Sequence, residues 1–356
     1  MPALTILAVG DIMLGDSPQV FGFGVASSIR KHGASALFDQ VKPHLRNADL
    51  TIANLEVVVS SPPAGAAFGE RIYRGGTETL PTLREAGIDV VTVCTNHTMQ
   101  HGQEAFDACM VACQSAGLKI AGADSAAAGI QRTLEMDVSG RRVCVLSYNL
   151  RPVQYRTAPP AWPAPTLELM TREVAEASAR ADVVLVTLHW GDEFIEYPSP
   201  DQISLAHALV DAGADIVIGH HPHIVQGIER YNGAVIAYSL GNFVFDQWQP
   251  RLRRSLMLEL HVHGRKQVDY TVHPTVIGTR YAPEPCEGEL RERELEHHRR
   301  LAALIGVHDS ESYRAELDTQ YKRFRKEILM HYLTKFWKFN PAHYLQNIAE
   351  IVRRRL

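Results

Sequence analysis

The sequence has few cysteines, and they do not follow the pattern of a disulfide framework or a zinc knuckle. Five cysteines occur in 356 residues, an odd number without CxxC spacing. Cys109 and Cys113 lie four residues apart in an apolar stretch, where we interpret them as small buried residues of a helix. A reducing compartment fits this cysteine usage best.

The sequence also lacks a recognisable leader and a long apolar segment. The N-terminal run LTILAVG reads as a strand without a basic region before it, and no stretch holds about 18 uninterrupted apolar residues. We therefore expect a cytoplasmic protein that is neither secreted nor membrane-spanning. P-loop, dinucleotide-binding and GxSxG motifs are absent as well, so nucleotide-loop and serine-hydrolase chemistry are unsupported.

What the sequence does contain is an alternation of strands and helices. Short apolar, β-branched runs alternate with helix-like segments up to residue 275: TILAV, DLTIA, DVVTVC, RVCVLSY, ADVVLVTLHW, ADIVIGHH and AVIAYSL. Such runs predict sheet buried on both faces, hence an α/β fold. LPTLREAGID and PDQISLAHALVDAGAD predict helices that begin near a proline and end at Gly87 and Gly213. SLMLELHVHG and QVDYTVHPTVIG predict an antiparallel pair.

From about residue 287 the chain becomes charged and helical, so we divide it into a domain over residues 1–286 and a helical extension over residues 287–356. The last 36 residues, 321–356, hold nine Lys or Arg against two Glu and interleave them with aromatic residues. One interpretation is a helix that contacts an anionic membrane surface or a protein partner. The alternative is a helix that packs its aromatic face on the catalytic domain.

Polar residues that can bind metal follow the predicted strands directly. They are Asp11, Glu56, Asn96, His97, His189 and the run His220 to His223. In α/β folds ligands collect at the carboxyl ends of the strands, so residues distant in sequence become neighbours. Seventeen histidines in a chain of net charge −4 point the same way, because histidine binds metals and carries protons near pH 7.

The strongest local signal is GHHPH at residues 219–223, where a His-x-His pair follows a strand. Each of the other candidates has an ordinary structural explanation when taken alone. Asn96 could be a turn residue, His189 a core histidine and Glu56 a surface charge. Taken together, they are better explained by a metal centre.

The order Asp, Glu, Asn-His, His, His-x-His resembles the calcineurin-like metallophosphoesterase superfamily, and within it the CapA branch, named for poly-γ-glutamate capsule synthesis. The resemblance covers residues 5–250. It rests on GDIMLG, NLE, TNH, HWGDE, PSPDQISLAHALVDAGADIVIGHHPHIVQGIE and YSLGNFVFD, which occur in the order of that branch.

The resemblance implies a four-layer α-β-β-α sandwich that holds two divalent metal ions. The implied ligands are Asp11 and His223 for one ion, Asn96, His189 and His221 for the other, and Glu56 as a bridge, with His220 as a further candidate. His97, beside Asn96, would donate or accept a proton, and both count as catalytic candidates. Mixed Asn, His and carboxylate ligands suit Mn, Fe or Zn, and Ca or Mg if waters complete the shell.

Two departures from the branch bear on the reaction. The usual Asn-Asn-His-x-x-Asp-x-Gly is altered, with Thr95 in place of the first Asn and Gln100 in place of the Asp. Gln100 can offer His97 only a neutral hydrogen bond. The Asp-x-His opening of ordinary phosphoesterases is also missing, because Ile12 and Met13 follow Asp11, which weakens the case for simple phosphatase activity.

Further candidates surround this proposed centre. Arg71 and Arg74 could bind a carboxylate or phosphate of the substrate, or be ordinary surface arginines, and Trp190 could form a wall of the site. Residues expected to orient the ligands are Gln100, Asp192, Glu193, Asn242 and Asp246.

Three functions compete on this basis. The first is hydrolysis of a peptide-like or polyanionic substrate. The second is epimerisation of a peptide, in which the metals stabilise an enolate and His97 moves the α-proton. The third is a non-catalytic assembly or polymer-binding factor that uses residues 321–356 to contact a membrane or partner. We expect no nucleic-acid partner.

Overall fold

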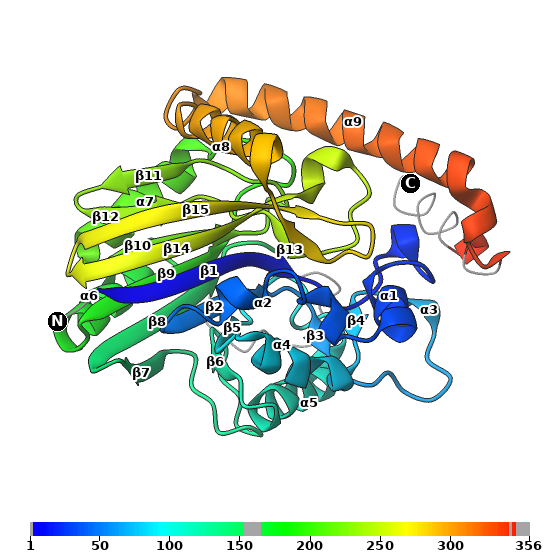
Figure 1. Ribbon diagram of the computed structural model, residues 1–356, viewed down its shortest axis with the longest axis horizontal. Coiled ribbons are helices and arrows are strands. Elements are labelled where there is room, and N and C mark those ends of the chain that lie inside the picture. Colours follow the sequence, from blue (N-terminus) through cyan, green and yellow to red (C-terminus); the bar gives the residue numbers. More distant parts are fainter. Residues whose placement is uncertain (1–2, 153–164, 342–343, 347–356) are drawn as a thin grey trace.

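Two β-sheets lie face to face, and helices cover the outer face of each, in the computed structural model of the chain (Figure 1). The structure describes residues 3–152, 165–341 and 344–346. The expected four-layer α-β-β-α arrangement is therefore confirmed. Parts of the sequence analysis that concern residues 342–343 and 347–356 fall outside the described residues.

The first sheet runs in the order β16-β15-β14-β1-β2-β5-β6, and β13 pairs with β1. Its strands are β1 (Leu4–Ile12), β2 (Leu50–Leu55), β5 (Val90–Thr92), β6 (Lys119–Ala121), β13 (Asn242–Val244), β14 (Arg254–Gly264), β15 (Gln267–Ile277) and β16 (Pro283–Pro285). Strands β1, β2, β5 and β6 are parallel, whereas β14 and β15 form the predicted antiparallel pair.

The second sheet runs in the order β11-β12-β10-β9-β8-β7. Its strands are β7 (Leu134–Val138), β8 (Arg141–Asn149), β9 (Val183–His189), β10 (Ile216–His220), β11 (Ile228–Tyr231) and β12 (Ala234–Ala237). The four inner strands are parallel, as their continuous apolar runs predicted. A separate two-stranded sheet, which the sequence analysis missed, pairs β3 (Val58–Val59) with β4 (Arg74–Gly75).

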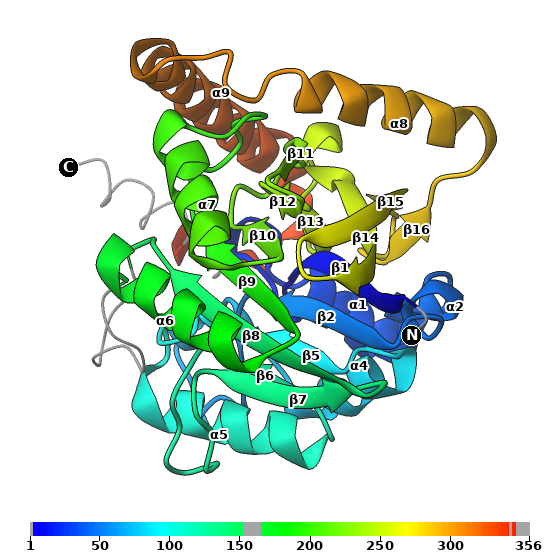
Figure 2. The same cartoon turned by 90° about the vertical axis from the view of Figure 1, so that its left-hand side faces the viewer.

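Helices flank the two sheets on opposite sides. The first sheet is accompanied by α1 (Val25–His32), α2 (Lys42–Leu45), α3 (Phe68–Arg71), α4 (Leu80–Ala86) and α5 (Gly102–Ser115). Helices α6 (Leu167–Arg180) and α7 (Pro200–Ala212) lie side by side on the second sheet (Figure 2). The chain continues through α8 (Gly288–Ala302) and α9 (Ser310–Lys335). Short 3-10 turns are η1 (Pro18–Val20), η2 (Ser35–Leu37), η3 (Thr77–Thr79), η4 (Pro250–Arg253) and η5 (Phe336–Lys338).

Helix α7 shows how the sequence sets an element's ends. Pro200 occupies the first turn, and Ser199 and Gln202 form a capping box, so the first free N–H groups are satisfied. The helix ends before Gly213, whose φ of 123° favours glycine. Both predicted boundaries are confirmed, and α4 likewise ends before Gly87 with φ of 115°.

Alternation along each strand produces three hydrophobic layers. On β1, Ile6 and Ala8 face the second sheet, while Leu7 and Val9 face α4 and α5. On β9, Leu185 faces the first sheet, and its sequence neighbours face α6 and α7. Because every inner strand is apolar on both faces, polar side chains concentrate where the strands end.

Helix α9 lies across one side of the sandwich (Figure 1). Its Tyr313 is buried beside the loop that follows β9, and His331 and Tyr332 are buried near η1. Leu301 of α8 belongs to the core between the two sheets. No helix within the described residues combines the length and apolar character that crossing a bilayer requires.

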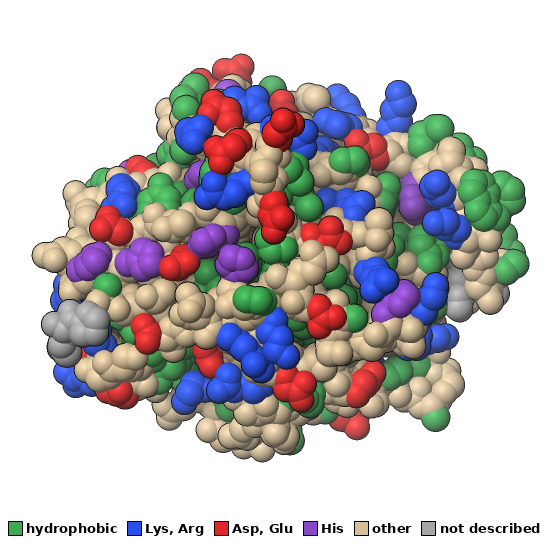
Figure 3. All heavy atoms as spheres, in the orientation of Figure 1, with side chains coloured by type: hydrophobic (Ala, Val, Ile, Leu, Met, Phe, Trp, Pro, Cys, Tyr) green, Lys and Arg blue, Asp and Glu red, His purple; other side chains and the backbone are tan. Residues whose placement is uncertain are grey.

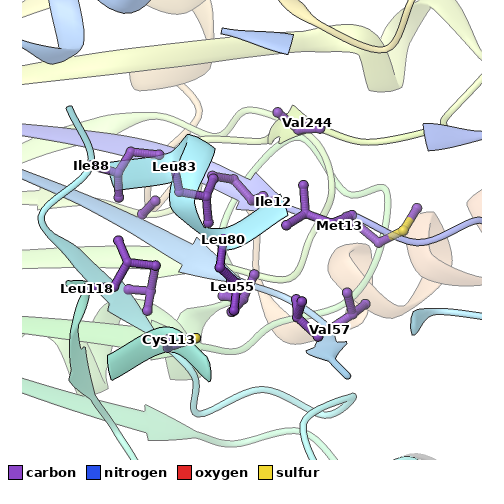
Figure 4. Close-up of a cluster of buried hydrophobic side chains, with 14 of the residues drawn as sticks. Ile12, Met13, Leu55, Val57, Leu80, Leu83, Ile88, Cys113, Leu118 and Val244 are labelled. Carbon is purple, nitrogen blue, oxygen red and sulfur yellow. The ribbon is translucent and has the colours of Figure 1, made fainter. Parts of the chain in front are cut away.

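The layer between the first sheet and its helices provides a direct test of the packing. Leu83 of α4 is fully buried among Leu80, Leu118 and Ile88 (Figure 4). We expect Leu83→Ala to lower the free energy of unfolding by about 2–5 kcal/mol, because it removes buried methyl groups and leaves a cavity. Leu167→Ala, at a position 53% exposed, should change it by less than about 0.5 kcal/mol. Denaturant titration followed by circular dichroism measures both, and equal effects would contradict this packing.

Candidate metal centre

Four strand ends, two from each sheet, meet at one place. Asp11 lies at the end of β1, Glu56 follows the last residue of β2, and His189 and His220 are the last residues of β9 and β10. His189 and His220 are paired in register across β9 and β10. Asp11 of the first sheet contacts His220 of the second, with 3.0 Å between Oδ1 and Nδ1. The predicted convergence at the carboxyl ends is therefore what the structure shows.

Asp11 is the most highly connected of these residues. Its Oδ1 accepts a hydrogen bond of 2.9 Å from Asn54 Nδ2, and its Oδ2 accepts one of 3.3 Å from the backbone N–H of His221. His223 Nδ1 lies 3.4 Å from Oδ2. His220 Nδ1 makes no aligned hydrogen bond within the described residues, so its contact with Asp11 is a close approach of a ring nitrogen to a carboxylate oxygen. Asp11 thus joins β1 to the GHHPH loop.

Glu56 shares the side chain of Asn54 with Asp11. Asn54 Nδ2 also donates to Glu56 Oε2 over 3.2 Å, so one amide holds both carboxylates. Glu56 Oε1 lies 3.5 Å from His189 Nε2, and the same nitrogen is 3.0 Å from Asn96 Oδ1. Asn96 and His189, which the resemblance assigned to one ion, are therefore in contact.

His221 and His223 are held in an uncommon backbone conformation. Their φ angles are 93° and 56°, values that side-chain-bearing residues rarely adopt and that cluster at functional sites. The His221 ring lies 4.8 Å from the His189 ring, centroid to centroid. His223 Nδ1 donates to Asn242 Oδ1 over 2.9 Å, which leaves its Nε2 free to bind a metal. Asn242 is itself fixed by donating to the carbonyls of His223 and Leu252.

The residues present fit divalent metal ions. Glu56, His221 and His223 each offer a ligand atom within 4.8 Å of the others, and all three are buried. Several buried atoms of the cluster have no hydrogen-bond partner among the described residues: Glu56 Oε1, His189 Nδ1 and both ring nitrogens of His221. Buried polar groups are normally paired, and a concentration of unpartnered ligand atoms such as this one suits the binding of a cation. These three residues include Glu56, which the resemblance assigned as the bridge, and one predicted ligand for each of the two ions, His221 and His223.

The charges of the cluster support the same conclusion. Burial and the nearby charge of Asp11 raise the pKa of Glu56 well above its usual range. Burial also opposes ionisation of Asp11, but its contacts with His220 and His223 outweigh burial and hold its pKa well below the usual range. Burial would lower the pKa of His223, yet Asp11 and Glu56 raise it to about 10. A bound cation would offset the same negative charge that here favours a proton on His223.

His189 and His221 are in the form that binds metals. Burial, reinforced by neighbouring histidines, lowers the pKa of each well below the usual value. Both rings are therefore neutral near pH 7, with a lone pair available to an ion.

His97 lies beside the cluster and is held by a neutral partner. Its Nδ1 is 2.7 Å from Gln100 Oε1, and its ring packs 4.6 Å from the ring of Tyr73. Because an amide oxygen only accepts, Nδ1 carries the proton and Nε2 keeps a lone pair. Burial lowers the pKa of His97 to about 4, which Gln100 only partly opposes. The substitution at position 100 thus leaves His97 a neutral base.

Trp190 is buried away from the site, whereas Arg74 lines a cavity together with Arg71 and its substrate role stays a prediction. Trp190 is 1% exposed in the core under α6 and α7, where its Nε1 donates to the carbonyl of Tyr238 over 3.1 Å. This corrects the expectation that Trp190 forms a wall of the site. Arg74 donates to the carbonyls of Ser60 and Ser61, at 3.1 and 2.9 Å, so its guanidinium holds a loop. Arg71 stays exposed beside Phe21, on a cavity of about 620 Å³, and its substrate role stays a prediction.

The acidic residues expected to orient the histidines have other contacts. Asp192 pairs with Arg151 Nη1 at 3.1 Å and accepts from the Tyr313 hydroxyl at 3.3 Å. Glu193 is half-buried and close enough to His223 for its charge to raise that pKa. Asp246 accepts from the backbone N–H of Ser17 at 2.7 Å, away from the histidines, which corrects its expected role.

Asn54 is the functional residue that the sequence analysis missed. Its position two residues before Glu56 on an extended strand places both side chains on one face, so the NLE motif carried the signal. Arg151 was also missed. It follows β8, and its charge lowers the pKa of His221, but no motif marks it in the sequence.

Comparison with known proteins agrees with this fold. Two solved structures are similar: a novel phosphatase from Mycoplasma pneumoniae (TM-score 0.51, 12% identity, covering 79% of this chain and 96% of that one) and a hypothetical protein from Thermus thermophilus (TM-score 0.50, 18% identity, covering 76% and 98%). These likenesses concern the fold alone, and they agree with the metallophosphoesterase-type sandwich that the sequence resemblance implied.

Sequence comparison identifies the family within this fold. The profile described as bacterial capsule synthesis protein PGA_cap matches residues 5–247. Capsule biosynthesis protein CapA of Bacillus anthracis is 32% identical over 297 residues, covering 81% of this chain and 70% of that protein. PGA biosynthesis protein CapA of Bacillus subtilis (strain 168) is 32% identical over 275 residues, covering 76% and 70%. The chain belongs to the PGA_cap family of CapA-like capsule synthesis proteins.

The position of Asp246 predicts a pH-dependent contribution to stability. Burial, together with the charge of Asp16, raises the pKa of Asp246 to about 8. A carboxyl whose folded pKa exceeds its unfolded value of about 3.9 destabilises the fold increasingly as pH rises from about 4 to 8. The Asp246→Asn variant keeps a side-chain oxygen that can accept from the Ser17 N–H, but it cannot ionise. Its melting temperature should therefore fall less steeply between about pH 4 and pH 8 than that of the wild type. Asp201→Asn, on exposed α7, is the matched control. An unchanged slope in Asp246→Asn would contradict the assignment.

Proposed function

We propose that this protein is a dinuclear metal-dependent enzyme that hydrolyses a peptide-like or polyanionic substrate. The observation that carries the proposal is the set of buried ligand atoms without partners at the meeting point of both sheets. A purely structural cluster would have to leave these atoms unpaired at a cost of about 1–3 kcal/mol each. Metal ions remove that cost and supply a function.

The chain's own residues suit this role. Asp11, Asn96, His189, His221 and His223 would hold the ions, with Glu56 between them. Divalent cations in such a site increase the acidity of water and stabilise negative charge that develops on a substrate oxygen. His97, whose Nε2 keeps a lone pair, would accept or return a proton at the edge of the cluster.

The substrate class follows from the relatives' names and from the neighbouring charges. The Bacillus subtilis relative is named for PGA biosynthesis, so a γ-glutamyl polymer is the first substrate to test. Arg151 adds a cation next to the site, where it would attract a carboxylate of such a polymer. Its Nε is buried without a partner among the described residues.

Metal content is the first test of this proposal. We expect purified protein loaded with Mn²⁺ or Zn²⁺ and then dialysed to retain about two ions per chain, as a two-metal site requires. His221→Ala and His223→Ala should each lose at least one of them. His263→Ala, on the exposed surface, is the matched control and should retain both. Plasma mass spectrometry gives the count, and full retention in the two site variants would refute the proposed ligands.

A second activity, peptide epimerisation, is favoured by one observation. His97 is held by the amide of Gln100 at 2.7 Å in the tautomer that leaves Nε2 unprotonated, the form that an acceptor of an α-proton needs. In this alternative the same residues would hold the ions, whose positive charge would stabilise negative charge on the substrate carbonyl oxygen, and no peptide bond would be broken.

Incubating γ-glutamyl oligopeptide with metal-loaded protein in D₂O separates the two activities. Hydrolysis predicts new amino termini and no deuterium at Cα, whereas epimerisation predicts deuterium at Cα and an unchanged chain length. His97→Ala should reduce either activity by about 100-fold or more, the usual contribution of a general acid or base. If metal-loaded protein forms neither product, the result would favour the third function, a non-catalytic assembly factor.

A further inference from the structure

The C-terminal part of α9 divides its aromatic residues between two opposite faces. On the inner face, His331 Nε2 lies 2.9 Å from the carbonyl of Gln19, and the Tyr332 hydroxyl donates to the carbonyl of Pro18 over 3.4 Å. Phe324 packs on Phe194 at 4.3 Å between ring centroids. These residues attach the helix to the body of the protein. They account for only part of the aromatic pattern seen in the sequence.

The outer face carries large apolar side chains that are more than half exposed, although Phe336 and Trp337 pack edge-to-face on each other. Trp337 is 64% exposed, Phe336 58% and Leu333 57%, at the junction of α9 and η5. Leu329, Met330 and Leu333 lie on one side of α9 by their spacing, and Leu329 and Met330 are each 48% exposed. Phe336 and Trp337 follow them in η5. We call these five residues the outer apolar face. Figure 3 shows hydrophobic side chains gathered at this end of the molecule, with Lys and Arg beside them.

The surrounding charge is strongly positive. Residues 322–338 contain six Lys or Arg and one acidic residue, Glu327, a formal charge of +5. Because the whole chain carries −4, the remainder carries −9. Glu327 is paired with Arg323 at 2.9 Å and lies 3.7 Å from Arg251, so it does not neutralise the outer face. An anionic surface would therefore attract this end of the protein and repel the rest.

We propose that the outer apolar face binds the surface of an anionic phospholipid bilayer, as a peripheral contact. Trp, Phe and Leu flanked by Lys and Arg on one side of a helix are the composition of interfacial membrane-binding helices. The apolar side chains project from a convex end of the molecule, so a bilayer can receive them without a matching groove (Figure 3). A second copy is disfavoured, because two +5 surfaces repel each other. The inference is independent of the proposed enzymatic reaction.

Vesicle flotation of the full chain tests this proposal. We expect binding to vesicles of phosphatidylcholine with about 30% phosphatidylglycerol, at least about tenfold weaker binding to phosphatidylcholine alone, and loss of binding as salt rises. A variant that combines Leu333→Glu, Phe336→Glu and Trp337→Glu should bind at least about tenfold more weakly. Leu167→Glu with Val307→Glu, which alters equally exposed apolar residues elsewhere, should bind like the wild type.

Each other outcome overturns the proposal. Equal binding to neutral and anionic vesicles would show that the basic residues have no role. Equal loss in the control variant would show a general effect of added charge. A dimer that dissociates only in the Leu333, Phe336 and Trp337 variant would assign the face to a second copy. The melting temperature and the metal content should be the same in every variant as in the wild type. Unchanged values would show that a loss of vesicle binding comes from the outer apolar face and not from unfolding or from loss of the metal centre.

Discussion

The negative charge of Asp11 and Glu56, buried where the two sheets meet, constrains the rest of the site. Both carboxylates share the amide of Asn54 and are removed from water, and burial together with the charge of Asp11 raises the pKa of Glu56. Histidines from the second sheet surround them, and two of these, His221 and His223, accept a strained backbone to do so. Such an arrangement is costly in an apolar interior unless cations occupy it. A metal-binding site therefore explains this cluster better than a purely structural role for its buried polar side chains does.

The fold brings this centre together by a simple rule. Parallel strands with apolar residues on both faces leave their carboxyl ends as the place for polar side chains, and the two facing sheets bring two such edges together. The sequence therefore allowed the strands, the layers and the convergence of the candidate ligands from Asp11 to His223 to be predicted. Short elements such as β3 and β4 were missed, because two-residue strands leave no periodic signal.

Side-chain contacts away from the strand ends were harder to predict. Trp190 directly follows His189, yet the two side chains point to different layers, as neighbours in extended chain do. Arg74 and Asp246 carry the right chemistry but direct it to backbone groups of nearby loops. The basic, aromatic residues 321–356 had two interpretations in the sequence. The inner face of α9 packs on the body of the protein, as one interpretation has it, whereas Leu333, Phe336 and Trp337 are exposed. Only tertiary structure decides such cases.

The central claim, that the convergence of strand ends binds metal, is tested most directly by locating the ions. Anomalous X-ray diffraction from crystals of Mn²⁺- or Zn²⁺-loaded protein, recorded on either side of the metal's absorption edge, would do so. The account predicts peaks about 2.0–2.3 Å from ligand atoms of Glu56, His221 and His223, as typical metal–ligand distances require. Loaded protein whose anomalous peaks lie only elsewhere, for example at the surface histidines of β14 and β15, would contradict it.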